Sequence, residues 1–255
     1  MYQEERLVKI LHALKEKEKL SNEEVCQMLG ISRDTARRDI VKLTEQGAAI
    51  RTHGGIALPL IKEEIQAYKN RLTSFSHEKH LIGKYSSNLI EKYDLCFFDV
   101  STTIKFLCDH LKTPAAIYTH SLDNIESLSD NEKADVHLIG GKLDRKYRFF
   151  YDPDFQTVIE SISFDKAFIG ACGICEDGIY YETKEDRIIK KTAAERSKQV
   201  YLLADFSKFD QDSKFRAFDF SMIDVLVTDR KPPAKFQEIL KEHKVKILIS
   251  KLRSD

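Results

Sequence analysis

The sequence predicts an α/β protein in which a small helical N-terminal domain precedes a larger domain with a mainly parallel sheet. Two observations support this fold class. Apolar residues follow helical spacing through about residue 46, whereas from residue 79 onward short apolar runs alternate with amphipathic segments. The 255 residues, of which 42% are apolar, are enough for two packed domains of unequal size. We expect domains over residues 1–58 and 79–255, joined by a polar linker over residues 59–78.

Composition excludes several classes of protein. No uninterrupted apolar run approaches the ~20 residues of a membrane-spanning helix, and the polar start at Gln3 and Glu4 is not typical of a signal peptide, so we expect a cytoplasmic protein. Among the five cysteines, Cys172 and Cys175 alone have pair spacing, and we interpret them as small side chains near a strand end, with no metal site and no cofactor. Because 41 basic residues balance 41 acidic ones, any DNA contact must be a local patch.

The first two helices of the N-terminal domain are indicated by spacing and by end signals. Apolar residues between Leu7 and Leu14 recur every three or four positions and predict one buried helix face. Ser21, with Glu24 three residues later, fits a capping box that begins a second, short helix. Gly30 is typical of the residue that ends such a helix.

A third helix is predicted from about Arg33 to Gln46, with Ser32 as its N-cap. Ala36, Ile40 and Leu43 fall on one side and predict its buried face. The other side carries hydroxyl and basic groups, which suit phosphate oxygens and guanine edges, so the helix pair predicts a helix-turn-helix. Its candidate DNA contacts are Ser32, Arg33, Thr35, Arg37, Arg38 and Lys42.

Two short strand-like runs follow this helix and predict a hairpin. Arg51 and His53 would lie on it as a wing that meets an adjacent groove or the DNA backbone. The alternative is an ordinary three-helix bundle with a solvated face, on which Asp34, Asp39 and Glu45 dilute the positive charge.

The larger domain is predicted to contain seven buried strands and five helices. The strands are residues 95–98, 115–119, 136–140, 167–170, 200–204, 225–228 and 245–249. The helices are residues 81–93, 101–111, 122–128, 185–197 and 234–242. Short strands that alternate with helices favour a parallel sheet with helices on both faces.

Polar or small residues follow four of these strands, at 101–103, 119–121, 140–142 and 205–208. Ligands of open α/β sheets bind beyond the carboxyl ends of the strands, and helix N-termini favour anions. The pattern therefore predicts a site for a phosphate and its attached hydroxyls. The alternative for any single turn is an ordinary helix cap, because serine and threonine are common there.

The string from Ile31 to Ile40, followed by the string from Arg51 to Gly55, resembles the DeoR family of bacterial transcriptional regulators. In that family a serine, a threonine three residues on and then Arg-Arg-Asp mark the recognition helix, and Arg-x-His-Gly-Gly marks the wing. Ala36 stands where isoleucine or valine is more usual. The similarity covers nearly the whole chain, and it implies a winged helix-turn-helix that binds operator DNA.

The resemblance also implies that the second domain is similar to ribose-5-phosphate isomerase in fold and binds a phosphorylated sugar or sugar acid. The positions that match or replace the family's motifs are Asp99, Ser101, Thr102, Thr103, Thr119, His120, Ser121, Gly140, Gly141, Glu185, Asp205 and Lys208. Two of them depart from the family. Ser101 replaces a glycine and His120 replaces an asparagine, so we expect a reshaped pocket.

We therefore expect a transcriptional repressor of sugar-metabolism genes that works as a homodimer or homotetramer, because two recognition helices on one face of DNA need a two-fold partner. One alternative is a sugar-phosphate isomerase-like enzyme, with Asp99, Glu185 or Asp205 as the base. Another is a regulator whose C-terminal domain only oligomerises. A fused DNA-binding domain has no use in an isomerase, which favours a regulator.

Overall fold

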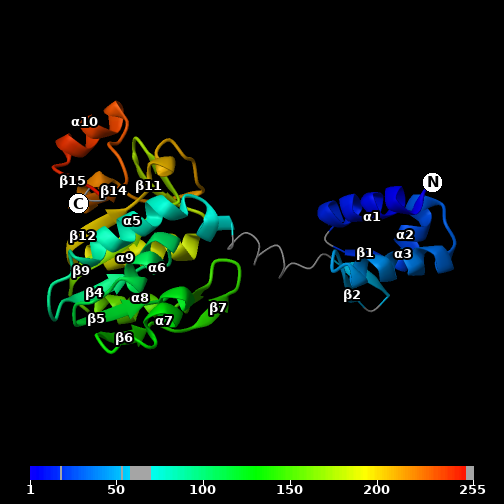
Figure 1. The fold of residues 1–255 in the computed structure, drawn as a ribbon, viewed down its shortest axis with the longest axis horizontal. Coiled ribbons are helices and arrows are strands. Elements are labelled where there is room, and N and C mark those ends of the chain that lie inside the picture. Colours follow the sequence, from blue (N-terminus) through cyan, green and yellow to red (C-terminus); the bar gives the residue numbers. More distant parts are fainter. Residues whose placement is uncertain (18, 53, 58–69, 251–255) are drawn as a thin grey trace. The chain divides into compact units, whose positions relative to one another are not determined.

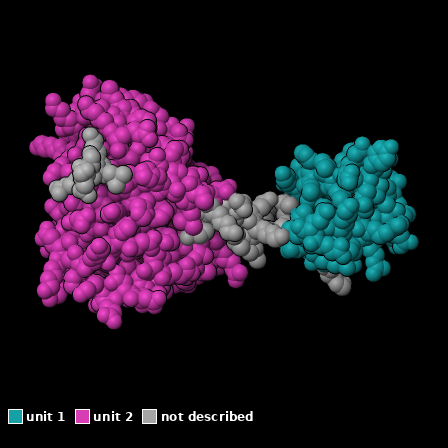
Figure 2. All heavy atoms as spheres, in the orientation of Figure 1, with its two compact units in different colours: residues 1–67 teal, residues 68–255 magenta. Residues whose placement is uncertain are grey.

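The computed structural model describes residues 1–17, 19–52, 54–57 and 70–250. The chain divides into two compact units, residues 1–67 and 68–255, and each is described by itself (Figure 2). His53 and residues 59–69 of the predicted linker lie outside the described residues. In the described part of the chain, no helix is long and apolar enough to span a membrane.

In its described residues, the first unit combines three helices with a small antiparallel sheet (Figure 1). Its elements are α1 (Gln3–Lys17), β1 (Lys19–Ser21), α2 (Asn22–Leu29), α3 (Arg33–Glu45), β2 (Ile50–Thr52) and β3 (Gly55–Ala57), with strand order β1-β3-β2. The capping box of Ser21 and Glu24 is present, and Gly30 ends α2 in the left-handed conformation at φ 62°. The sequence did not indicate β1, because only Leu20 of its three residues is buried and no alternation is visible.

The apolar faces predicted for the three helices meet in one core. Ten side chains are buried there: Leu7, Ile10, Leu14, Leu20, Val25, Ala36, Ile40, Leu43, Ala49 and Ile56. The core therefore fixes which side of α3 remains available to solvent.

The second unit is built on a seven-stranded parallel sheet, as predicted, with strand order β15-β14-β12-β9-β4-β5-β6 (Figure 1). The strands are β4 (Leu95–Phe98), β5 (Ala115–Thr119), β6 (Ala134–Leu138), β9 (Phe164–Gly170), β12 (Ser197–Leu203), β14 (Val225–Thr228) and β15 (Lys246–Ile249). The helices are α5 (Ser76–Ser87), α6 (Thr102–Asp109), α7 (Leu122–Leu128), α8 (Phe155–Glu160), α9 (Lys184–Glu195) and α10 (Ala234–Glu242). Helix α5 begins within the predicted linker, before residue 79.

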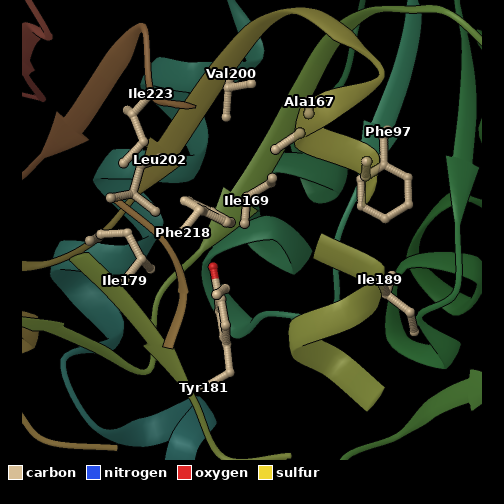
Figure 3. Close-up of a cluster of buried hydrophobic side chains, with 14 of the residues drawn as sticks. Phe97, Ala167, Ile169, Ile179, Tyr181, Ile189, Val200, Leu202, Phe218 and Ile223 are labelled. Atoms are coloured by element: carbon tan, nitrogen blue, oxygen red, sulfur yellow. The ribbon is translucent and has the colours of Figure 1, made fainter. Parts of the chain in front are cut away.

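Alternate strand residues point to opposite faces of this sheet, and each face has its own core. Phe97 and Ile169 face the cluster that includes Ile189 of α9 and Phe236 of α10. Figure 3 shows part of this cluster. Phe98 and its neighbours on the other face pack in a second cluster that includes residues of α5 and α6. Helices therefore cover both faces, as the sequence predicts.

Two small antiparallel sheets are additional to this layout. Strands β7 (Lys142–Asp144) and β8 (Phe149–Tyr151) form a hairpin, and β10 (Gly173–Cys175), β11 (Gly178–Tyr181) and β13 (Phe215–Phe218) form a sheet. Two 3-10 helices, η1 (Phe206–Lys208) and η2 (Phe220–Met222), follow β12 and β13. The sequence did not predict these elements, because they are three or four residues long, and two of them, β10 and β11, begin with glycine.

Candidate functional site

Helix α3 presents a basic face to solvent. Arg33, Arg37 and Arg38 are exposed, opposite the buried Ala36 and Ile40. Arg38 Nε donates to the Asp34 carbonyl at 3.3 Å, one turn earlier on the same helix. Arg33 lies 4.0 Å from the Glu23 carboxylate in a pair that is well exposed on both sides. Such weak contacts leave the guanidinium groups available to a ligand, because exposed ion pairs contribute little.

The hydroxyl groups at the start of α3 cap the helix. Ser32 is the N-cap and accepts a hydrogen bond from the Thr35 amide at 3.3 Å, and the two hydroxyl oxygens lie 3.0 Å apart. Both groups remain at the helix N-terminus, where a phosphate is favoured. The predicted DNA contacts and the helix cap therefore share the same residues.

Asp39 does not dilute the positive charge of an exposed face. It is fully buried, and it accepts hydrogen bonds from Arg6 Nε at 2.7 Å and from Gln3 Nε2 at 2.9 Å. Burial opposes ionisation, but the bonds from Arg6 and Gln3 hold the pKa of Asp39 below its usual value. Asp39 thus holds α3 against α1, and the charged groups exposed on this part of α3 are the three arginines together with Asp34.

Lys42 and Arg51 differ in their surroundings. Lys42 is half-buried and donates to Gln3 Oε1 at 3.0 Å, so it also helps to hold α1 in place, whereas Arg51 is exposed on β2.

Each of the two glycines of the wing is required for a different structural reason. Gly54 adopts φ 90°, and a Cβ on Gly55 would lie 2.0 Å from the Leu20 carbonyl oxygen. His53, the remaining predicted DNA contact, lies outside the described residues.

A hollow of about 440 Å³ lies in the second unit at the carboxyl ends of the central strands; we call it the effector hollow. From β4 the chain continues through β5 to β6 at one edge, whereas β9, β12, β14 and β15 proceed to the other edge. The winding direction therefore reverses between β4 and β9. Ser101 follows β4, Gly170 ends β9, and both line the hollow. Ligands of open α/β sheets bind at such switch points.

The N-terminus of α6 forms one side of the effector hollow. Ser101 caps it and accepts hydrogen bonds from the amides of Thr103 at 3.1 Å and Ile104 at 3.3 Å. Thr102 and Thr103 also line the hollow. Gly170 is required opposite this cap, because a Cβ there would lie 2.5 Å from Ser101 Oγ. The positive end of the helix dipole makes this side attractive to an anion.

Two lysines from distant parts of the sequence also line the hollow. Lys208 comes from η1, and Lys79, which is only 4% exposed, comes from α5. Burial and then the charge of Lys208 lower the pKa of Lys79 to about 8. The hollow therefore holds like charges close together, an arrangement that a bound anion would relieve.

A buried ion network lies along the floor of the hollow. Lys190 of α9 is 3.0 Å from an Asp99 carboxylate oxygen and 3.1 Å from one of Asp186, and it lies 4.1 Å from the centre of the Tyr181 ring. Burial raises the pKa of Asp99, Lys190 opposes this rise and Asp186 adds to it. Asp99 also accepts the Gly170 amide at 2.8 Å, so it holds β4 and β9 together below the hollow.

The residues after β5 are buried beside this network. Thr119 donates to the Phe98 carbonyl at 2.7 Å, and Ser121 caps α7. His120 is fully buried against Phe97, and its Nε2 lies 3.8 Å from an Asp186 carboxylate oxygen. None of the three lines the hollow in the described part of the chain.

The remaining predicted effector residues lie in different places. Gly140 and Gly141 line a second hollow beside β6 and α8, because the chain turns away at Gly141, where φ is 134°. Glu185 is half-buried on α9 and does not line the effector hollow, although Asp186 beside it does. Asp205 is buried and caps η1, which carries Lys208.

Sequence reasoning missed several residues of the effector hollow: Arg71, Lys79, Lys146, Glu182, Thr183, Asp186 and Lys190. A lysine on a helix is usually exposed, so Lys79 and Lys190 gave no signal of burial. For Lys190 a signal exists in Asp186, since the two lie four residues apart on one helix face.

Comparisons with known proteins agree with this organisation. The family model of the DeoR C terminal sensor domain matches residues 74–230, and that of the DeoR-like helix-turn-helix domain matches residues 6–61. The HTH-type transcriptional repressor GlcR of Bacillus subtilis (strain 168) is 41% identical over 98% of this chain and 97% of its own length. The HTH-type transcriptional regulator IolR of the same strain is 34% identical over 89% of this chain and 92% of its own length.

Solved structures are more distant. Ribose 5 phosphate isomerase A from Neisseria gonorrhoeae has a TM-score of 0.36 at 15% identity over 54% of each chain. The β subunit of eIF2B from Chaetomium thermophilum has a TM-score of 0.48 at 14% identity, over 69% of this chain and 56% of that one. Scores below 0.5 add nothing to the fold described above.

The family models and the relatives decide between regulator and enzyme. Both models together span most of the chain, and the two relatives carry the names of transcriptional regulators. The prediction that the chain is not an isomerase-like enzyme is therefore confirmed. The helix-turn-helix match also confirms a DNA-binding unit at the N-terminus. This chain belongs to the DeoR family of transcriptional regulators.

Proposed function

We propose that this protein represses genes of sugar metabolism and that a phosphorylated sugar or sugar acid, bound in the effector hollow, controls its affinity for an operator. The observation that carries the proposal is the hollow itself. It lies at the switch point of the sheet and combines the N-terminus of α6 with Lys79 and Lys208. A dipole end and two ammonium groups suit a phosphate.

The carboxylates and hydroxyls of the hollow suit the rest of such a ligand. Thr183 and the carboxylates of Glu182 and Asp186 line it together with the basic groups. Carboxylates accept hydrogen bonds from sugar hydroxyls. A cavity of about 440 Å³ falls in the ordinary range for small-molecule sites.

The names of related regulators support the sugar assignment. A lactose phosphotransferase system repressor of Streptococcus mutans is 27% identical over 94% of this chain. A glycerol-3-phosphate regulon repressor of Escherichia coli is 27% identical over 97%. One name refers to a sugar uptake system and the other to a phosphorylated compound, and phosphorylated compounds are the ones that the hollow's charge favours.

On the DNA side, the exposed arginines of α3 and Arg51 of the wing are the proposed contacts, with Ser32 and Thr35 on phosphate oxygens. We expect a homodimer or homotetramer, because paired operator half-sites require paired recognition helices. The net charge of zero means that the binding energy must come from this local patch.

The test uses the full-length protein. Operator binding is measured by fluorescence anisotropy on DNA from upstream of its own gene, with a panel of hexose and pentose phosphates and with the unphosphorylated sugars as matched controls. Ligand at 100 times its Kd stabilises a protein by about 2.7 kcal/mol, which raises Tm by roughly 5–10 °C for a unit of this size. A Tm shift and a changed operator affinity with phosphates alone support the proposal. If no compound of the panel shifts Tm or changes operator affinity, the result favours the alternative in which the second unit only oligomerises.

A further inference from the structure

Strand β6 is one of the two outermost strands of the seven-stranded sheet (Figure 1). Within the described residues, β5 is its one partner in the sheet, and their pairs run without a bulge from Ala115↔Ala134 to Thr119↔Leu138. Proteins often protect an edge strand with a proline or a bulge, because its backbone groups can pair with another chain. β6 contains neither, so its sequence and register leave the outer edge able to pair.

The backbone groups that face this outer edge follow from the hydrogen bonds to β5. The Lys133 carbonyl accepts the Ala115 amide at 3.1 Å. The Ile139 amide donates to the Thr119 carbonyl at 2.8 Å. Because backbone direction alternates along a strand, odd-numbered residues of β6 bond β5 and even-numbered residues point outward. The outward residues are therefore Ala134, Val136 and Leu138.

A second copy of the chain fits this edge in antiparallel orientation, with a two-fold axis at Val136. A two-fold interface brings the same surface of both copies together, so the strand must be complementary to itself. With the axis at Val136, the two Val136 residues exchange both backbone hydrogen bonds, and the Leu138 amide faces the Ala134 carbonyl of the second copy. Asp135 then lies directly opposite His137 of the second copy. This pair occupies the non-hydrogen-bonded positions, where facing side chains are closest.

The side chains of β6 match this register. Asp135 is exposed, and His137 Nε2 lies 3.1 Å from its carboxylate within one chain. Tyr118 of β5 stacks on the imidazole, with 4.4 Å between the ring centres. Across the axis each carboxylate would have imidazoles as neighbours along and across the strands, and like groups would lie on the more distant diagonals. An axis at Asp135 would instead set two carboxylates opposite each other, so the charges favour Val136.

Apolar side chains beside this edge also favour a protein partner. Leu138 is 45% exposed and Val158 of α8 is 48% exposed, and both line the second hollow, which has a volume of about 590 Å³. A strand added at β6 would remove part of this apolar surface from water. The opposite edge strand, β15, has no such match, because Lys246 is its one charged residue and two copies paired there would bring no opposite charges together.

We propose that β6 pairs with β6 of a second copy of this chain, antiparallel about Val136, and that the two sheets join into one. The inference rests on the proposed function, in which paired operator half-sites require paired copies, and it names the surface that joins them. Among the described residues that line the effector hollow, none belongs to β6. Assembly and ligand binding can therefore be tested separately.

Sedimentation velocity on the full-length protein tests the interface through charge variants. In Asp135→Lys a second cationic side chain faces His137, and in His137→Glu a second carboxylate faces Asp135. Because each substitution acts twice across a two-fold axis, we expect each variant to dissociate into particles of half the parent's mass, with a dissociation constant raised roughly tenfold or more. Lys246→Glu, on an exposed lysine of β15, is the matched control and should sediment as the parent.

Mixing the two variants tests the register. In a mixed pair the introduced lysine of one copy faces the introduced glutamate of the other, and the unchanged His137 faces the unchanged Asp135. The mixture should therefore form particles of the parent's mass, and so should the double variant Asp135→Lys with His137→Glu. Single variants that associate as the parent does, or a mixture that associates no more tightly than either variant alone, would overturn the proposal.

A proline variant decides if His137→Glu fails to fold. The Val136 amide points away from β5, so Val136→Pro removes a donor of the outer edge and keeps the hydrogen bonds to β5, as prolines in edge strands do. This variant should also sediment at half the parent's mass. Parental mass in a folded Val136→Pro protein counts against pairing at β6.

The interface and the proposed function fail differently. If the parent protein is a monomer at micromolar concentration, the expected homodimer or homotetramer fails, and this interface with it. If the parent is an oligomer and the β6 variants sediment like Lys246→Glu, only the β6 interface is overturned. Control of operator affinity by a sugar phosphate is measured with the ligand panel, and a negative result there leaves the sedimentation result unchanged.

Discussion

Replacing Lys190 with methionine should strongly destabilise the second unit. The side chain is 2% exposed and lies within 3.1 Å of oxygens of both Asp99 and Asp186. The substitution keeps the volume but leaves two carboxylates without their cation. Breaking a buried ion pair in this way costs about 3–5 kcal/mol, and the added apolar burial returns about 1 kcal/mol. The expected net loss is about 2–4 kcal/mol, which lowers Tm by roughly 5–15 °C for a unit of this size.

Calorimetry on the full chain measures this loss, because the transitions of the two units can be followed separately. Lys191→Met is the matched control. Its lysine is the next residue, is 42% exposed, and lies 3.7 Å from Glu195, so it should cost less than about 0.5 kcal/mol. The double variant Lys190→Met with Asp99→Asn should recover part of the loss, because one orphaned charge is then gone.

The same variant should change the pH dependence of stability. Without Lys190, the pKa of Asp99, which burial already raises, rises further, and Asp186 loses the larger of the two partners that lower its pKa against burial. A group whose folded pKa is raised takes up a proton on folding, so the variant gains stability as pH falls. Its deficit relative to the parent should therefore shrink between pH 8 and pH 5. A deficit as small as that of Lys191→Met, or one that does not change with pH, would refute the argument.

Three further predictions concern ligand and DNA binding. Arg37→Ala and Arg38→Ala should each weaken operator binding by ~1–3 kcal/mol if the arginines contact bases, or reduce the dependence of log affinity on log salt concentration by about one if they contact phosphates. Titrations at several salt concentrations measure both quantities. Unchanged affinity and salt dependence in both variants would remove α3 from the interface. Lys208→Ala should weaken effector binding by ~1.5–3 kcal/mol in calorimetric titrations, and a parental affinity would show that the phosphate lies elsewhere. Ser101→Gly with His120→Asn should change the preference among sugar phosphates in the same assay; an unchanged ranking would mean that these positions do not shape the pocket.

Most of the regular structure follows from local sequence signals. Leu95–Phe98 and Ala115–Thr119 have the predicted bounds, because each is a short, mostly apolar run, the first between Asp94 and Asp99 and the second between Pro114 and His120. The start of β9 at Phe164 precedes the predicted residue 167, because the strand also contains Asp165 and Lys166. Lys166 is buried there and bonds Asp94 at 2.8 Å, a partner from a distant part of the chain. Local patterns contain no information about such a partner.

The candidate site was predictable to a lesser extent, for a related reason. Turn chemistry after β4 identified the residues around Ser101, because capping is local. Lys208 was predicted from its place after β12, whereas Lys79 and Lys190 were not, since they become buried only when helices from separate regions pack on the sheet. Gly140 and Gly141 were predicted to belong to the effector site but line the second hollow instead. The pattern at a strand end does not reveal which way the following hairpin turns.

Under the proposed function, the cap at Ser101 would affect the effector concentration at which the protein responds. Its hydroxyl already accepts the amides of Thr103 and Ile104, which are the donors that an anion at this helix end would use. A phosphate bound here, as proposed, would compete with the Ser101 hydroxyl for these two amides. A serine cap is worth about 1 kcal/mol, which corresponds to a roughly fivefold weaker Kd than uncapped donors would give. A weaker Kd would move the response of the proposed regulator toward metabolites that are present at higher concentration.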